Sequence, residues 1–174
     1  MADDKKEKWL NWLALSTLIF SAAATLGSSK AGGYSGKSTA HQILASDQWA
    51  FYQAKSTKQH LYELQREALT LQALAAPENA QAKYKETIDH YAQELTRYDG
   101  EKKAIKAKAE GHEKTRDESA KFAELFGQAV LYLQVAIILS AMAGLLKKQP
   151  MWFISFLPGV TGLVYFLYAY WLTW

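Results

Sequence analysis

The chain lacks cysteine, and this absence removes disulfide bonds, thiolate nucleophiles and thiolate metal ligands together. It also has little proline, three residues in 174, so most of the chain is free to form helices. Its formal net charge of +3 is small. Nucleic-acid binding requires a strongly basic face, so we expect no nucleic-acid partner.

Charged residues are missing from three long segments, at residues 9–26, 128–146 and 150–174. A helix needs about 20 apolar residues to cross the hydrocarbon core of a bilayer. Nearly all the charge lies between the first two segments. The sequence therefore predicts an all-α membrane protein with three transmembrane helices, with membrane lipid as a partner and a soluble helical hairpin between the first and second spans.

The expected organisation follows from these segments. It comprises a cytoplasmic tail at 1–8, a transmembrane helix at 9–27, a Gly/Ser linker at 28–39, a coiled-coil-like soluble hairpin at 40–121, a second transmembrane helix at 122–146, a basic loop at 147–150 and a third transmembrane helix at 151–174. A cleaved signal peptide is the alternative interpretation of the first span. Its apolar run is longer than is typical of signal peptides, so we favour a retained anchor.

Aromatic rings cluster at the ends of the spans. Such rings have an apolar body and a polar edge, which favours the headgroup region of a bilayer. We predict membrane-interface anchors at Trp9, Trp12, Trp152, Tyr170, Trp171 and Trp174.

Lysines predict the orientation. The N-terminal tail carries three of them, and the short loop between the last two spans carries Lys147 and Lys148. Positive residues in short segments favour the cytoplasmic side. The N-terminus is thus expected in the cytoplasm and the hairpin in the periplasm.

Two apolar stripes with helical spacing occur in the soluble region. One comprises Leu61, Leu64, Ala68, Leu71 and Ala75, and the other comprises Tyr84, Ile88, Tyr91, Leu95 and Tyr98. Pro77 lies between them and is expected to end the first helix. The simplest arrangement buries one stripe against the other in a hairpin. Two helices bury little surface, so the tyrosine stripe is also expected to contact other copies or a partner.

Further interaction residues are predicted outside these stripes. Three large aromatic residues follow the first span closely, namely Trp49, Phe51 and Tyr52. We expect them to pack near Phe122 and Phe126 or on a neighbouring copy. In the last two spans, small residues that let helices approach each other occur at Ala136, Ser140, Gly144, Gly159 and Gly162.

The stretch from Ala31 to Ser38 matches the relaxed phosphate-loop pattern [AG]-x-x-x-x-G-K-[ST]. Such a loop must follow a buried strand and open a helix in an α/β sheet, and neither context is predicted. We therefore expect no nucleotide partner. The glycines are interpreted as a flexible exit from the first span, with Ser38 or Thr39 capping a helix that starts near Ala40.

The remaining polar residues predict no chemistry. No histidine follows a Glu at the Glu-x-x-His spacing of a di-iron bundle. His60 shares a helix face with Glu63 and Glu67, a pattern more typical of ordinary surface pairs than of a metal site. The first and third spans contain no ionisable group, and the second has only Glu124 at its edge, which argues against a proton relay. We expect no catalytic, cofactor or metal site.

The run "SDQWAFYQAKSTKQHLYELQRE" at 46–67, preceded by "WLALSTLIFSAAATLGSSKAGGYS", resembles a bacterial membrane family known as domain of unknown function 4337. The resemblance extends nearly end to end. It implies a bacterial inner-membrane protein and brings no activity, cofactor or catalytic residue.

Together these features predict a non-enzymatic structural or interaction protein, either a homo-oligomer or an accessory subunit of a larger membrane complex. One alternative is a channel or transport component formed by an oligomer of the spans. The other is an enzyme or metal-binding protein that uses the histidines and carboxylates of the soluble helices.

Overall fold

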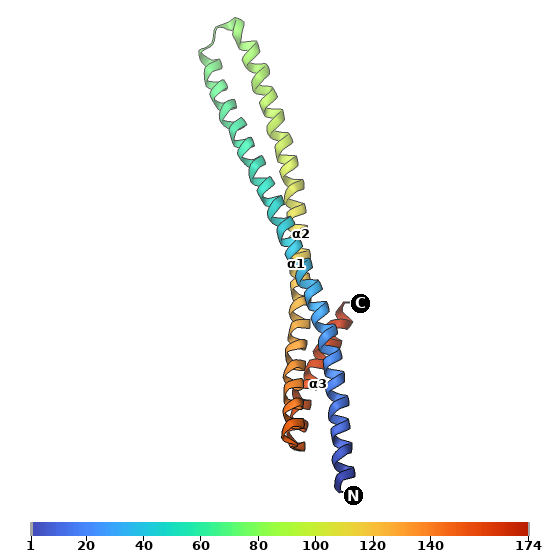
Figure 1. Cartoon of the computed structure of the whole chain (residues 1–174). Coiled ribbons are helices and arrows are strands. Elements are labelled where there is room, and N and C mark those ends of the chain that lie inside the picture. The colour runs from blue at the N-terminus through green and yellow to red at the C-terminus, as the bar shows by residue number, and fades with distance from the viewer. Residues whose placement is uncertain (1, 174) are drawn as a thin grey trace. The chain divides into compact units, whose positions relative to one another are not determined.

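The computed structural model describes the backbone of residues 2–173 and the side chains of residues 8–173. Within this range the chain forms three α-helices, α1 (Ala2–Ala75), α2 (Glu78–Leu146) and α3 (Gln149–Leu172) (Figure 1). The predicted all-α fold is confirmed. The predicted anchor Trp174 lies outside the described residues.

Pro77 separates α1 from α2, as predicted. Helix α1 ends at Ala75 and α2 begins at Glu78, so the proline lies in the connection. Proline lacks a backbone N–H and disfavours helical geometry in the residue before it, which here is Ala76. The Pro77 carbonyl accepts a hydrogen bond from the N–H of Ala80 at 2.9 Å and so starts the next helix.

A second, tighter break separates α2 from α3. Lys147 adopts a left-handed backbone with φ of 51°. Its N–H donates to the Gly144 carbonyl at 3.3 Å, and the N–H of Lys148 donates to the Ala143 carbonyl at 3.1 Å. This pair of bonds is the Schellman motif that commonly ends helices. Helix α3 then begins at Gln149, two residues before the predicted span.

The predicted flexible linker at 28–39 is wrong. These residues lie inside α1, so neither Ser38 nor Thr39 begins a helix. Each glycine in a helix costs about 1 kcal/mol relative to alanine. Packing on the same segment offsets that cost, because Tyr34 stacks on Phe126 with ring centroids 6.0 Å apart and also contacts Phe122.

The chain divides into two compact units. The bundle unit contains the residues up to Thr39 together with those from Arg116 onward. The hairpin unit contains Ala40–Thr115. Each unit has its own core and its own chemical character.

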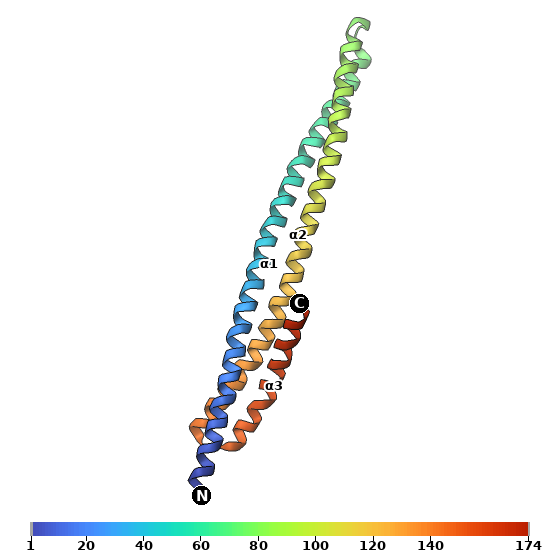
Figure 2. The same cartoon turned by 90° about the vertical axis from the view of Figure 1, so that its right-hand side faces the viewer.

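The bundle unit packs segments of all three helices together (Figures 1 and 2). Its buried apolar cluster comprises Phe20, Ala23, Ala24, Leu133 and Ala136. Gly159 lies directly against the ring of Phe20, and a Cβ atom at Gly162 would lie 3.0 Å from the backbone carbonyl of Ala129. The small residues therefore let α3 approach both neighbours closely.

The outside of the bundle unit is apolar. Each of the three helices contains an 18-residue window that is long and apolar enough to cross a membrane, judged by length and composition. Only 17–33% of each window is buried within the protein. The apolar side chains that remain exposed include Leu18, Ile138 and Leu157.

Candidate interaction surfaces

The seam of the hairpin unit is built on α1 from residues spaced alternately three and four apart. The buried and half-buried positions that follow this spacing are His41, Ala45, Gln48, Tyr52, Lys55, Gln59, Tyr62, Arg66 and Leu69. This is the heptad spacing of a coiled coil. Most of these seam positions thus carry polar or aromatic residues, and Leu69 is the one leucine among them.

The tyrosine stripe of α2 faces this seam. Tyr62 packs edge-on against Tyr91 with ring centroids 5.2 Å apart, and its ring is tilted against that of Tyr98 with centroids 5.6 Å apart. Leu95 and Tyr98 are 8% and 5% exposed. Leu95 and Tyr98 are therefore covered within one chain, whereas Tyr84, Ile88 and Tyr91 are only half-buried, and contact of the stripe with other copies stays a prediction.

The outer members of the same stripe lie near the connection between the helices. Tyr84 and Ile88 are half-buried, and each lines a different open groove of the hairpin. Their partial exposure follows from their position, because only one neighbouring helix is available to cover them.

The leucine stripe of α1 is on the outside, contrary to the prediction that it packs against α2. We call Leu61, Leu64, Ala68, Leu71 and Ala75 the leucine face. All five are exposed, and the three leucines are 55%, 63% and 69% exposed. Periodicity detects an apolar stripe on a helix but does not say which face a neighbour covers, and here the opposite face of α1, which includes Tyr62, packs against α2.

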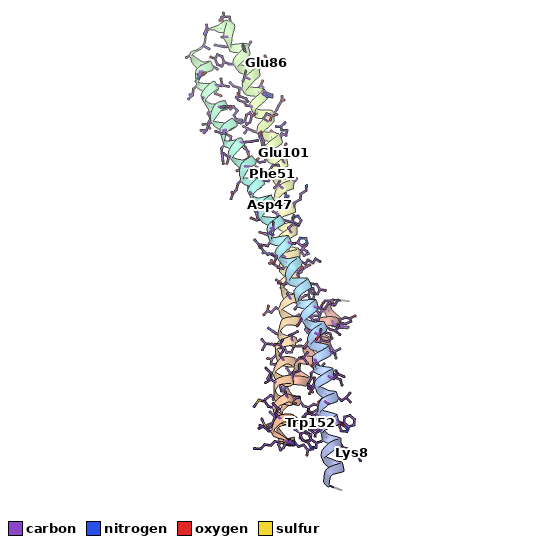
Figure 3. All side chains as sticks on the ribbon, in the orientation of Figure 1. Lys8, Asp47, Phe51, Glu86, Glu101 and Trp152 are labelled. Carbon is purple, nitrogen blue, oxygen red and sulfur yellow. The ribbon has the colours of Figure 1, made fainter. Side chains whose placement is uncertain are left out.

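Polar contacts across the seam set the register of the hairpin. Gln59 is buried, and its amide N–H donates to Asp99 at 2.9 Å while its carbonyl accepts from Lys102 at 2.8 Å. Lys55 forms an ion pair with Glu101, which is labelled in Figure 3. The hydrogen bond from Lys55 holds the pKa of the Glu101 carboxyl below its ordinary value. These contacts require one particular alignment of α1 and α2.

The predicted aromatic cluster is split between the seam and the surface. The indole N–H of Trp49 donates to the Glu113 carboxylate at 2.9 Å, and its ring packs edge-on against Tyr52. Tyr52 is half-buried, whereas Phe51 is 51% exposed. Of the predicted partners, Phe122 and Phe126 pack against Tyr34. Trp49 and Tyr52 thus belong to the hairpin seam.

A histidine pair was missed by sequence reasoning. The Nδ1 atoms of His41 and His112 are 3.1 Å apart across the seam, which lets one share a proton with the other. The two residues are 71 positions apart in the chain. From sequence alone, this pair could be found only by folding the chain back at Pro77 and aligning the heptad pattern of α1 with that of α2.

The small residues of the last two spans pack within one chain. Ala136 and Ser140 are fully buried, and the Ser140 hydroxyl donates to Ser155 at 2.9 Å between α2 and α3. A Cβ atom at Gly144 would meet Leu13 of α1 at 3.7 Å. Together with Gly159 and Gly162, these residues serve contacts inside the bundle unit, not the contacts between copies that we expected.

The predicted aromatic anchors fall into two groups. Trp152 is buried (Figure 3); its indole N–H donates to the Ser16 hydroxyl at 3.1 Å and its ring contacts Trp9. These two residues therefore help to hold the helices together. Trp12 and Trp171 are exposed, at 62% and 73%, as surface anchors must be. Tyr170 is also exposed and lies beneath the Lys30 ammonium, 5.8 Å from its ring centroid.

The glycine-rich stretch has no phosphate-loop geometry. Residues 31–38 lie inside α1, where backbone N–H groups are directed along the helix toward carbonyls one turn earlier. The His60 ring accepts or donates a hydrogen bond with Glu63 at 3.0 Å, as an ordinary surface pair. Among residues 8–173 no group of three or more His, Cys, Asp or Glu side chains is arranged to hold a metal ion.

These features define an all-α protein of three long helices, each apolar enough over part of its length to cross a membrane. The chain belongs to the family described as a domain of unknown function (DUF4337), whose model matches residues 9–172. The resemblance noted from the 46–67 signature is thereby confirmed. Comparisons with curated proteins and with solved structures give no match.

Proposed function

We propose that this protein is a non-enzymatic structural or interaction protein of the bacterial inner membrane. Three transmembrane helices anchor it, and a polar helical hairpin presents an apolar contact surface outside the bilayer. It assembles with itself or serves as an accessory subunit of a larger membrane complex. The observation that carries the proposal is the contrast between the apolar exterior of the bundle unit and the polar hairpin unit.

The dimensions of the apolar segments support membrane spanning. On α1, the segment from Trp9 to Lys30 covers about 33 Å at 1.5 Å per residue. Helix α3 has 24 residues and so covers about 36 Å on the same basis. Both lengths fit a hydrocarbon core about 30 Å thick.

The distribution of side chains supports lipid as the surrounding medium. Leu18, Leu145 and Leu157 are 67%, 84% and 79% exposed on different helices of the bundle unit. In water an apolar surface of this extent would be unfavourable, whereas in lipid it costs nothing. The interior is filled by Phe20 and Leu133, so a single chain offers no room for a transport path.

The hairpin unit belongs in water. Its seam contains an ion pair and amide hydrogen bonds, and its outside carries the exposed charges of Lys83, Glu86 and Lys103 among others. Charged groups are costly within hydrocarbon. Lys147 and Lys148 favour a cytoplasmic position for the loop between α2 and α3, which leaves the hairpin in the periplasm.

An interaction role follows from what the hairpin leaves uncovered. Its seam is closed by contacts within one chain, but the leucine face is exposed. The seam contacts join α1 to α2. The feature that the hairpin presents to its surroundings is therefore the leucine face, rather than a reactive cluster.

Cysteine accessibility tests the proposal, because the natural chain has no cysteine. Three single variants, Lys83→Cys, Leu157→Cys and Lys148→Cys, are treated with a membrane-impermeant maleimide in intact spheroplasts and after lysis. We expect labelling of Lys83→Cys in intact cells and of Lys148→Cys only after lysis. Leu157→Cys should resist labelling in both cases, since hydrocarbon suppresses the reactive thiolate.

The Leu157 variant is the decisive one. Its side chain is 79% exposed within one chain, so protection has to come from lipid or another surrounding and not from the rest of the same chain. Labelling of Leu157→Cys as fast as Lys83→Cys, without detergent, would contradict membrane spanning. An exchange of the results for Lys83→Cys and Lys148→Cys would invert the orientation and leave the anchoring intact.

A further inference from the structure

The leucine face is placed almost opposite the seam of the hairpin. Successive residues of an α-helix are rotated by about 100°. Leu61 and Leu64 each lie two positions from a seam residue, Gln59 and Tyr62 respectively, which places them about 200° around the helix. Helix α1 therefore carries two heptad patterns, one covered by α2 and the other exposed.

The exposed pattern has the composition of a two-stranded coiled-coil seam. With Leu61 at heptad position a, the d positions are Leu64 and Leu71, and the following a positions are Ala68 and Ala75. Leucine at d is typical of parallel dimers. Alanine at a lets two helices approach closely, so that the leucines reach across.

We propose that the leucine face pairs with the same face of a second copy of this chain, in parallel and in register. This inference rests on the proposed function, because anchoring in one membrane makes both hairpins leave the bilayer on the same side. In such a two-fold pair each residue of the leucine face meets the same residue of the second copy. Two hairpins then form a four-helix assembly with the two α1 helices at its centre.

The residues that flank the leucine face favour the parallel arrangement. In a parallel pair each g position faces the e position of the next heptad in the other chain. His60 then faces Gln65 of the partner subunit, and Glu67 faces Gln72 of the partner subunit. Both pairs can form hydrogen bonds and neither opposes like charges. An antiparallel pair would place Glu67 beside Glu67 of the partner subunit, which is repulsive.

Membrane anchoring also explains how a leucine face of this short length can hold two copies together. The leucine face spans five positions, from Leu61 to Ala75, or about 21 Å of helix. Two copies in one bilayer are confined to a thin layer and keep a common orientation. Confinement of this kind raises the effective concentration of each hairpin for the other, as a linker does.

Single-cysteine crosslinking tests the pairing in native membranes. Identical residues meet where the two leucine faces pair, so Leu64→Cys is expected to form an intermolecular disulfide under mild oxidation. The product is a band at twice the mass of one chain. Gln93→Cys is the matched control, because Gln93 is exposed on α2 of the same hairpin. Absence of the Leu64→Cys crosslink, or equal crosslinking at both positions, would overturn the proposal.

A charge-swap experiment separates loss of pairing from loss of folding. Leu64 is 63% exposed, so Leu64→Glu and Leu64→Lys are expected to keep the helical circular dichroism of the natural chain. Neither variant should co-purify with a differently tagged copy of itself, whereas the two together should co-purify. Failure of the mixed pair, with helicity retained, would refute the pairing.

Extraction with alkaline carbonate distinguishes this inference from the proposed function. Leu64→Cys protein that stays in the membrane without crosslinking overturns the pairing alone. Crosslinked protein that carbonate removes from the membrane supports the pairing and overturns the anchoring.

Discussion

Replacement of Gly162 by alanine is expected to destabilise the bundle unit. An added Cβ atom would lie 2.8 Å from Leu133 Cγ, 3.0 Å from the Leu133 backbone N and 3.0 Å from the Ala129 carbonyl oxygen. Two of these atoms belong to the backbone of α2, so they cannot move aside without separating the helices. Overpacking of this kind costs about 1–3 kcal/mol. Alanine regains only about 1 kcal/mol of helix propensity relative to glycine.

Gly127→Ala is the control, because it gains the same propensity without a clash. No atom lies within 4 Å of the position that its Cβ would occupy. Thermal unfolding followed by far-ultraviolet circular dichroism in mild detergent should give a lower Tm for Gly162→Ala than for the natural chain, and an equal or higher Tm for Gly127→Ala. Each kcal/mol corresponds to about 2–4 °C in a protein of this size. A Tm for Gly162→Ala as high as that of Gly127→Ala would refute the close α2–α3 contact.

Two further substitutions test the hairpin seam and the end of α2. The Lys55 hydrogen bond lowers the pKa of Glu101 below 4.5, so this carboxylate stabilises the folded protein above about pH 4.5 and loses its contribution as the pH falls through its folded pKa. Glu101→Gln should therefore lower the Tm at pH 7 and converge with the natural chain in acid; a difference that stays constant with pH would contradict the ion pair. Lys147→Gly removes a side chain from a left-handed position, φ of 51°, and should stabilise the protein by about 1 kcal/mol. A lower Tm for this variant would show that the Lys147 side chain contributes more than its backbone strain costs.

The helix breaks and apolar segments were predictable because their causes are local. Pro77 ends a helix through its own ring and missing N–H, whatever the rest of the chain does. The three apolar segments follow from composition over about 20 residues. The family was also recognisable from a contiguous run of residues.

The continuity of α1 was not predictable from its glycines. Local propensity favours a break at 28–39, since Gly32, Gly33 and Gly36 each weaken a helix. The helix persists because Tyr34 packs against Phe122 and Phe126, residues about 90 positions away. A contact between distant segments outweighs the local preference, and a single sequence does not reveal it.

The surfaces were assigned incorrectly for the same reason. Hydrophobic periodicity selected the leucines of α1 as the inner face, because leucine is more apolar than tyrosine or glutamine. The structure instead covers the seam on the opposite side of α1, where Gln59 finds partners in Asp99 and Lys102. Trp152 likewise looked like an interface anchor, but its bond to Ser16 makes it a core residue. In both cases the contact between helices determines whether the side chain is buried, and local sequence does not reveal that contact.

Native mass spectrometry of the full-length protein, released gently from its own membrane, tests the central claim most directly. The claim is that a membrane-anchored chain pairs with a second copy through the leucine face. The natural chain is predicted to appear as a species of two copies, and the Leu64→Glu variant as a single copy. A natural chain that appears only as one copy, or bound at fixed ratio to a different protein in place of the second copy, would contradict the claim.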